Sequence, residues 1–475
     1  MSILGIHNQS AGQISALPDF KFYVLATTHR QVDVKKYFFF RFFFEKSFLG
    51  MSSPKLAETT TDLPSSSTDE IAVQTGYHSS GLISSTLNLI KNIIATSMLT
   101  MPYGTSLSGV FPSVVMCVIV GTLSAFTFGL LGLLCGESKV VTYRQLCEKY
   151  LGKKIGNFVD LMLASYTLPC CIGYVCFVCD CMRVMLVELT DAPNAFYTSR
   201  TFIGIILSVT ILLPLCSTDK IHSLTWTSII GLGAIIYCYI FVAVDLGQQS
   251  NSDDLWHLVS SNLWWPPSGS PISLFPIANI YAAAFLVQYN SPKFFYELSN
   301  PTKKRFMTVS FSAVAFVVVF CTTFAVMGFA RFGFATQGNL LKGYSRAYAA
   351  WVATSVSLIT TYPFDFDGGR RSVISIVKQQ WPHVGDKKIF WISTLAMIPI
   401  FTTISVLVDD LSIVIGINGA VFGITTGFTI PGLLLWKKAN QDNEKKRKIV
   451  GACISGFGVS MSILGLVSII INYTQ

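Results

Sequence analysis

Two apolar stretches of this chain are interrupted by polar residues, and a small polar molecule could be bound at these interruptions. In the first, which runs from Asn88 to Gly109, Thr96 and Ser97 lie shortly before Pro102. Proline cannot donate to a helical hydrogen-bond ladder and disfavours helical angles in the residue before it. The stretch predicts a broken helix whose freed amides and carbonyls face protein or a wet cavity. The alternative is an ordinary kinked span, because proline is common in membrane helices.

The same pattern returns between residues 272 and 301. Gln288, Tyr289 and Asn290 precede Pro292 there. Such side chains are costly in lipid but useful around a polar ligand. We therefore predict a second broken span.

The composition is that of a membrane protein. Hydrophobic residues make up 51% of the 475 residues and charged residues 12%, and there are 36 Phe. Because about 20 apolar residues cross the hydrocarbon core, we predict an all-α polytopic membrane protein with eleven spans. They cover residues 84–108, 111–135, 157–187, 201–216, 223–246, 272–296, 306–330, 346–366, 389–408, 412–436 and 449–472. A short amphipathic helix is predicted at 143–152, and the tail 1–80 is predicted to be disordered.

The two broken spans open successive groups of five spans. Repeat one covers about 84–246, repeat two about 272–436, and 449–472 is an extra span. This placement is typical of inverted-repeat transporters, whose site lies at the midplane where the two breaks meet. Half-helix ends there present amides to a carboxylate and carbonyls to a cation or an amine. An amino acid offers both groups.

The net charge of +9 does not indicate nucleic-acid binding, because the basic residues follow the predicted topology. With the N-terminus inside, 28 Lys and Arg lie on the cytosolic side and five on the other, and Lys91 lies within the first span. This bias predicts a cytosolic N-terminus. An odd number of spans then places the C-terminus in a lumen or outside the cell.

Most of the twelve cysteines fall within spans, and five of them cluster between Cys170 and Cys181. A metal site is one interpretation. Since no histidine lies nearby, we favour their use as small, apolar packing residues.

Several short motifs together resemble the amino acid/auxin permease family, which includes vacuolar amino-acid transporters and sodium-coupled neutral amino-acid transporters. The resemblance covers about residues 81–472. Its carriers are Asn88, Lys91, Leu99, Pro102, Tyr103, Gly109, Leu213-Pro214-Leu215, Lys220, Tyr296-Glu297-Leu298, Phe332-Gly333, Tyr362-Pro363, Arg370 or Arg371, and Pro431.

The resemblance implies a leucine-transporter-like fold, with five plus five inverted spans and one more, that moves amino acids with a proton or sodium gradient. Two departures from the family pattern are visible. The usual Gly-x-Gly at the first break is Ala95-Thr96-Ser97, and a frequent His in the sixth span aligns with Gln288. The second change removes a group that titrates near neutral pH.

On these grounds we predict a secondary amino-acid transporter that works by alternating access. The main chain at the two breaks would hold the ends of the substrate, with side-chain partners at both breaks and a tyrosine on the opposite wall. The predicted substrate-binding residues are Ala95, Thr96, Ser97, Met98, Tyr174, Phe285, Gln288 and Tyr289. We predict no catalytic residue, metal or cofactor; the partners are an amino acid and the lipid bilayer.

The sequence leaves two candidates for the coupling ion, H+ and Na+. Thr354, Ser355 and Ser357 in the eighth span could hold sodium, although helix hydroxyls often bond to their own backbone. No carboxylate is clearly placed beside them, and neutral oxygens alone bind a hard cation weakly. Asp180 in the third span is the candidate for proton coupling, and the resemblance to vacuolar relatives favours the proton.

At the inner end, Glu297 and the basic residues 303–305 could form a gate; the alternative is a solvated helix end.

Two other function classes were weighed. A membrane enzyme needs paired catalytic groups, which the spans do not offer. An amino-acid sensor would share the fold and signal through the tail 1–80. The sequence is compatible with a location in the vacuolar, lysosomal or plasma membrane. It is also compatible with translation that starts at Met51 rather than at Met1.

Overall fold

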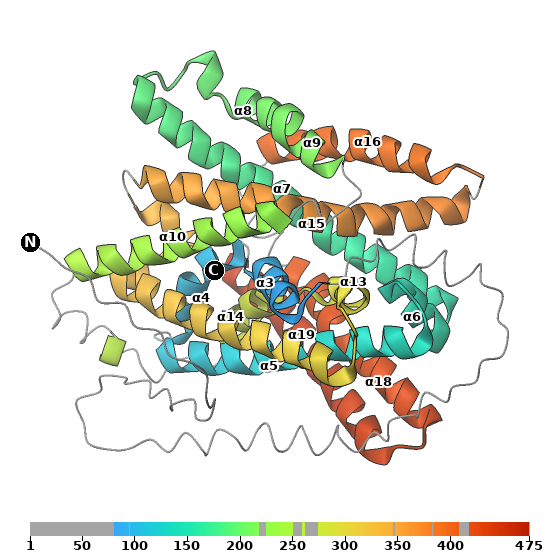
Figure 1. Ribbon diagram of the computed structural model, residues 1–475. Coiled ribbons are helices and arrows are strands. Elements are labelled where there is room, and N and C mark those ends of the chain that lie inside the picture. Colours follow the sequence, from blue (N-terminus) through green and yellow to red (C-terminus); the bar gives the residue numbers. More distant parts are fainter. Residues whose placement is uncertain are drawn as a thin grey trace, which may run out of the picture. The chain divides into compact units, whose positions relative to one another are not determined.

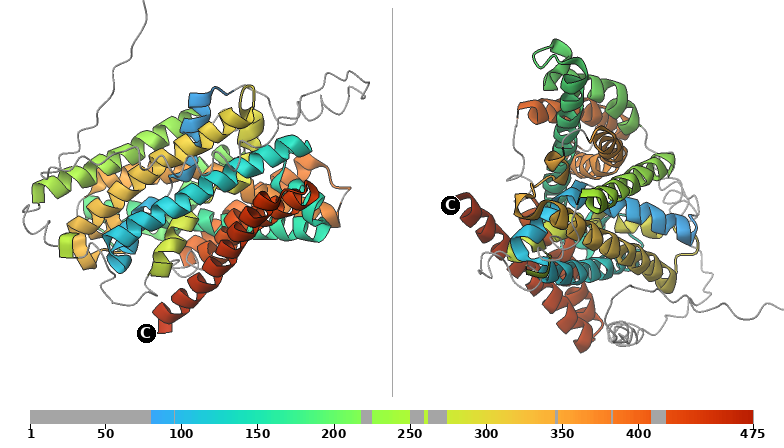
Figure 2. Two further views of the ribbon diagram at one scale, coloured as in Figure 1. Left: turned by 90° about the horizontal axis from the view of Figure 1, so that it is seen from below. Right: turned by 90° about the vertical axis from the view of Figure 1, so that its left-hand side faces the viewer.

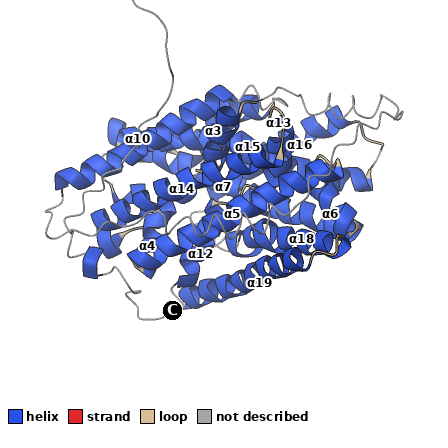
Figure 3. Ribbon diagram, turned by 60° about the horizontal axis from the view of Figure 1, so that its bottom comes forward, coloured by secondary structure: helices blue, strands red, loops and turns tan. Residues whose placement is uncertain are grey.

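A computed structural model describes residues 80–94, 96–217, 225–249, 259–261, 274–344, 347–381, 383–407 and 418–474. Within these ranges the chain is helical, and its one β-type pairing is an isolated bridge between Ser80 and Leu298 (Figure 3). The predictions for residues 1–79, Ala95 and Lys220 lie outside the described residues, as do the side chains of Thr96 and Ser97.

Helices occupy the positions of all eleven predicted spans. In chain order they are α3 (Leu82–Ile93) with η2 (Thr96–Thr100) and α4 (Met101–Ser108); α5 (Val110–Ser138); α7 (Lys153–Thr190); α8 (Arg200–Leu207) with η4 (Ser208–Leu212) and α9 (Leu213–Cys216); α10 (Thr225–Gln249); α12 (Leu274–Ala284) with η7 (Gln288–Asn290) and α13 (Ser291–Glu297); α14 (Lys303–Phe332); α15 (Tyr348–Gln380); α16 (Asp386–Leu407); η10 (Asn418–Gly423) with η11 (Thr425–Thr429) and α18 (Ile430–Gln441); and α19 (Lys445–Thr474). Seven of these elements in the described chain are long and apolar enough to cross a membrane, and the bent pair α3–α4 makes an eighth.

The short helix α6 (Tyr143–Leu151) follows α5, as predicted. Thr142 and Gln145 form a capping box at its start, and Gly152 ends it with a φ of 95°. Only glycine adopts such a φ without a steric penalty, so the chain turns directly into α7. Arg144 Nη1 donates to Ser375 Oγ at 2.8 Å, which places α6 beside the C-terminal part of α15.

The helices form two groups (Figure 1). One contains α7, α8, α9, α15 and α16, and its apolar core includes Cys171, Cys179, Phe366 and Phe401. The cysteine cluster thus packs between helices, as predicted. The other group contains α3, α4, α5, α12, α13 and α14, and α10 contacts both groups.

The last two helices, α18 and α19, pack closely against each other at glycines. A Cβ at Gly451 would lie 2.6 Å from the backbone nitrogen of Trp436, so no larger residue fits this contact. Small residues allow helix backbones to approach in this way. Figure 2 shows α19 running along the outside of the bundle to the C-terminus.

Candidate functional site

The first broken span bends by 49° between its two halves. Helix α3 ends at Ile93, Ile94 is extended, and η2 leads into α4. Pro102 lies in the first turn of α4, where its missing N–H costs nothing. The predicted break is present between Ile93 and Met98, and Pro102 begins the second half-helix rather than ending the first.

The second broken span is built the same way. Helix α12 ends at Ala284, the chain passes through Phe285 to Val287, and η7 leads into α13 with Pro292 in its first turn. Each break therefore consists of a half-helix, a short non-helical link, a 3-10 turn and a half-helix with proline at its start. The first break also contacts α12 through η2, so the two interrupted spans lie side by side.

Carbonyl groups freed at the second break are partly bonded to neighbouring helices. Phe285 O accepts a hydrogen bond from Ser124 Oγ at 2.6 Å, and Ala283 O accepts one from Tyr166 Oη at 3.1 Å. These contacts hold the end of α12 against α5 and α7. Such anchoring is expected where non-helical backbone lies at membrane depth.

Gln288 is fully buried, and its side chain turns toward α5 rather than toward the first break. Its Nε2 donates to Ser124 Oγ at 2.9 Å and Thr127 Oγ1 at 3.1 Å, and its Oε1 accepts from the amide of Val287 at 2.9 Å. Both N–H groups and the carbonyl oxygen are thus engaged. In this arrangement Gln288 braces the second break, and its role as a side-chain ligand for the substrate stays a prediction.

The two predicted tyrosines meet at a carboxyl group that the sequence analysis did not identify. Tyr174 Oη from α7 donates to Asp365 Oδ2 at 2.7 Å, and Tyr289 Oη from η7 donates to Asp365 Oδ1 at 2.5 Å. Asp365 lies on α15 and is 7% exposed. A charged residue within a predicted span is a signal for function, and the spacing Ser357, Thr361, Asp365 could have indicated a shared helix face.

One of the three hydroxyls predicted to bind sodium, that of Ser357, is bonded to a lysine. Lys91 Nζ, from α3, donates to Thr361 Oγ1 at 2.7 Å, Ser357 Oγ at 3.1 Å and Ser357 O at 3.3 Å. These contacts engage all three donors of an ammonium group. Lys91 is 2% exposed, so its charge is buried between the first broken span and α15.

The other two predicted sodium ligands are placed differently. Thr354 Oγ1 lies 3.1 Å from Cys238 Sγ of α10. Ser355 Oγ is buried without a hydrogen-bond partner among the described residues. A small cavity nearby joins Met98 of the first break to Thr354 and Ser357, so the predicted Met98 lies at the same place as the eighth-span hydroxyls.

The remaining predicted residues form ion pairs nearer the helix ends. Asp180 Oδ1 lies 3.1 Å from Arg200 Nε, with a third of the Asp180 side chain exposed. This partner argues against Asp180 as a group that faces the cavity. Glu297 Oε1 lies 3.9 Å from Lys293 Nζ in the same half-helix, and its role as a gate stays a prediction.

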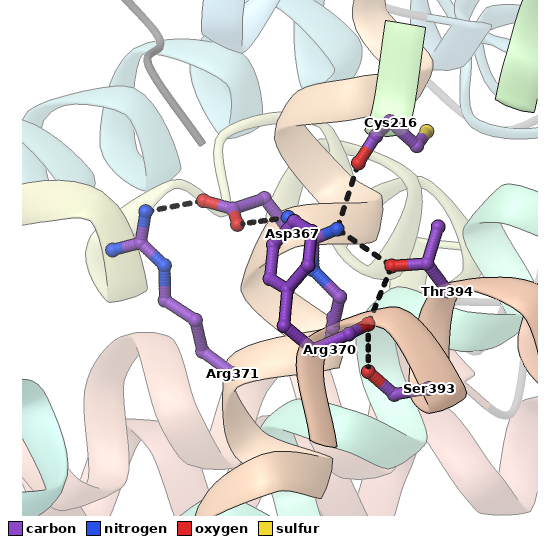
Figure 4. A network of polar contacts seen from close by, with 7 residues as sticks. Cys216, Asp367, Arg370, Arg371, Ser393 and Thr394 are labelled. Atoms are coloured by element: carbon purple, nitrogen blue, oxygen red, sulfur yellow. Dashed lines mark hydrogen bonds and ion pairs between the residues drawn. The ribbon is translucent and has the colours of Figure 1, made fainter. Parts of the chain in front are cut away.

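The C-terminal half of α15 is tied to its neighbours by Arg370, which is 1% exposed (Figure 4). Its Nη1 donates to Cys216 O at 2.7 Å and Thr394 Oγ1 at 2.9 Å, and its Nη2 pairs with Asp367 at 2.9 Å. The guanidinium also stacks 3.8 Å above the ring of Phe390. Arg370 thus joins α15 to α9 and α16.

The family model described as "Transmembrane amino acid transporter protein" matches residues 78–471. The chain belongs to the transmembrane amino acid transporter family. This match confirms the family predicted from the sequence motifs. The chain is therefore a multi-pass membrane protein of a family of transporters.

Relatives in this family are similar over much of the chain. The protein named "Putative sodium-coupled neutral amino acid transporter 11" from Danio rerio is 25% identical over 410 residues, which cover 82% of this chain and 86% of that protein. Vacuolar amino acid transporter 7 of Saccharomyces cerevisiae is 25% identical over 308 residues, which cover 63% of this chain and 60% of that protein.

Among solved structures, a substrate-bound, outward-open Na+-coupled sialic acid symporter is similar with a TM-score of 0.52 and 10% identity, covering 82% of this chain and 89% of that one. At this identity the likeness shows the fold alone. It confirms the predicted all-α, leucine-transporter-like fold of this member of the transmembrane amino acid transporter family.

Proposed function

We propose that the protein is a secondary active transporter that moves amino acids by alternating access, with the substrate held at the two breaks. The observation that carries this proposal is the matched construction of the breaks in adjacent spans. Two inverted half-sites of this kind can be exposed first to one side of the membrane and then to the other. The sensor alternative is not supported, because the family and the relatives described above are transporters.

We also propose that transport does not require sodium at the eighth-span hydroxyls. A sodium ion bound to Ser357, one of the three predicted ligands, would lie within about 4 Å of the Lys91 ammonium, and like charges at that distance repel by about 4 kcal/mol at an effective dielectric constant of 20. The ammonium already supplies a positive charge to the oxygens of Ser357. The proton is then the remaining candidate of the two coupling ions.

The proposal also includes the orientation of the chain and the membrane in which the protein lies. The 28 to 5 distribution of basic residues supports a cytosolic N-terminus and a luminal or extracellular C-terminus. The similarity to a yeast vacuolar transporter supports an acidic organelle such as a vacuole or lysosome.

The test is uptake by the full chain in proteoliposomes, with the standard amino acids supplied singly. We expect uptake of at least one amino acid to follow an imposed pH gradient and to persist when choline replaces sodium. Loss of uptake on that replacement would overturn the sodium-independent coupling. Absence of uptake or exchange for every amino acid under both gradients would overturn the transport function itself.

A further inference from the structure

A polar stripe runs along one face of α15. Ser357, Thr361 and Asp365 are spaced by four residues, so each lies about 6 Å further along the helix axis than the one before. Lys91 is bonded to the first two positions, and its charge interacts with the carboxyl group at the third. The stripe therefore holds a buried cation and a buried acid about one helical turn apart.

The stripe connects residues of both broken spans and of α7. Lys91 belongs to the half-helix before the first break, and Tyr289 belongs to the 3-10 turn of the second break. Asp365 lies on α15 and accepts a hydrogen bond from Tyr289, while Tyr174 holds its other oxygen from α7. A change in the charge of Asp365 therefore acts on the second break through the hydrogen bond from Tyr289. It acts on the residues beside the first break through its charge interaction with Lys91.

The titratable groups that face Asp365 come from three elements. They are Lys91 of α3, Tyr289 of η7, and Tyr166, Tyr174, Cys170 and Cys171 of α7. Phenols and thiols are neutral near pH 7, so the groups of this set that carry charge are Asp365 and Lys91.

We propose that Asp365 carries the coupling proton and that Lys91 is the cation that its carboxylate balances. This inference rests on the proposed transport function and deepens it. It replaces the predicted role of Asp180, which is paired with Arg200. It also gives the buried charge of Lys91 a role in coupling.

The two protonation states of Asp365 present different sites to the substrate. As a carboxylate, Asp365 accepts hydrogen bonds from both tyrosines and balances the Lys91 ammonium. When a proton binds, one carboxyl oxygen becomes a donor, so its bond from a phenol must change direction or break. The Lys91 charge is then unbalanced beside the first break, and an anionic group is favoured there.

The amino-acid carboxylate is such a group, so proton and substrate load together. After the site opens to the other side, the proton leaves Asp365 for water and the restored carboxylate again balances Lys91. One proton is bound and one is released in each cycle. An uncompensated buried charge is costly in low dielectric, and this cost gives the coupling its strength.

The test compares gradient-driven accumulation with exchange in proteoliposomes loaded with the same amino acid that the wild-type protein transports. For Asp365→Asn we expect accumulation driven by a pH gradient to fall by at least about tenfold, while exchange remains measurable and becomes insensitive to pH. Asp365→Glu should restore part of the accumulation. Glu188→Gln, which changes an exposed carboxyl group of α7, is the matched control.

Accumulation by Asp365→Asn that still follows the pH gradient would overturn the proposal. If this variant does not fold, Tyr289→Phe and Tyr174→Phe decide the question, because each keeps the carboxyl group and removes one phenol from it. We expect both to displace the pH of half-maximal uptake from that of the wild type; unchanged pH profiles in both would overturn the role of Asp365. Because the wild type is measured in parallel, failure of the transport function itself would be seen separately, as absent wild-type exchange.

Discussion

Gly231 of α10 lies directly against Lys91 of the first broken span. A Cβ at position 231 would lie 2.4 Å from Lys91 Cε, 2.9 Å from Lys91 Nζ and 2.3 Å from Thr360 Oγ1. The absence of a side chain at Gly231 therefore makes the room in which the buried ammonium meets α15.

Gly231→Ala is expected to displace Lys91 and to reduce uptake strongly. Overpacking a buried contact costs about 1–3 kcal/mol, so the thermal midpoint of the purified protein should also fall. Gly233→Ala is the matched control, since a Cβ there meets nothing within 4 Å. Equal uptake by the two variants would show that the position of the Lys91 side chain does not matter for transport.

Gln288→Ala is expected to lower uptake without removing the protein from the membrane. The change removes the acceptor of the buried Val287 amide, and an unsatisfied buried group costs about 1–3 kcal/mol. It also removes the link from η7 to the hydroxyls of Ser124 and Thr127 on α5. Surface labelling would measure the amount of protein and vesicle uptake its activity. Gln337→Ala, at an exposed position, is the control; normal flux from Gln288→Ala would mean that the second break does not need this brace.

Arg370→Lys is expected to destabilise the group of helices around α15. A lysine cannot reproduce the planar fork that reaches Cys216 O, Thr394 Oγ1 and Asp367 together. A loss of about 1–3 kcal/mol is expected for the buried partners left unbonded, measured as the thermal midpoint in detergent. Arg371→Lys should change stability by less than about 0.5 kcal/mol, because the Arg371 side chain is 53% exposed.

Cysteine labelling should detect the tail before Leu82 and the terminal Gln475 on opposite faces of the membrane. The reason is the placement of 28 basic residues on one side and five on the other. Single cysteines introduced at each end would be tested with an impermeant reagent before and after permeabilisation. Labelling of both ends from one face would require an even number of spans and a different arrangement of the repeats.

The local features of the fold could be predicted from the sequence because they depend on short-range physics. Apolar length predicts where the chain crosses the membrane, and proline after a polar pair predicts where a span is interrupted. The helices lie at all the predicted positions, and both breaks are present. Even here, Pro102 and Pro292 turned out to begin half-helices, because proline is well tolerated in a first turn.

The family, the all-helical fold and the two interrupted spans could be predicted from the sequence, because they depend on motifs, apolar length and proline position. Which polar groups meet depends on the tertiary structure. Lys91 forms a hydrogen bond with Thr361, which is 270 positions away in the sequence. Asp365 accepts hydrogen bonds from Tyr174 and Tyr289, and Gln288 donates to Ser124 of α5. These pairings depend on how each helix is rotated and packed against its neighbours, and a pattern with a period of 3.6 residues does not specify which neighbour a polar side chain will face.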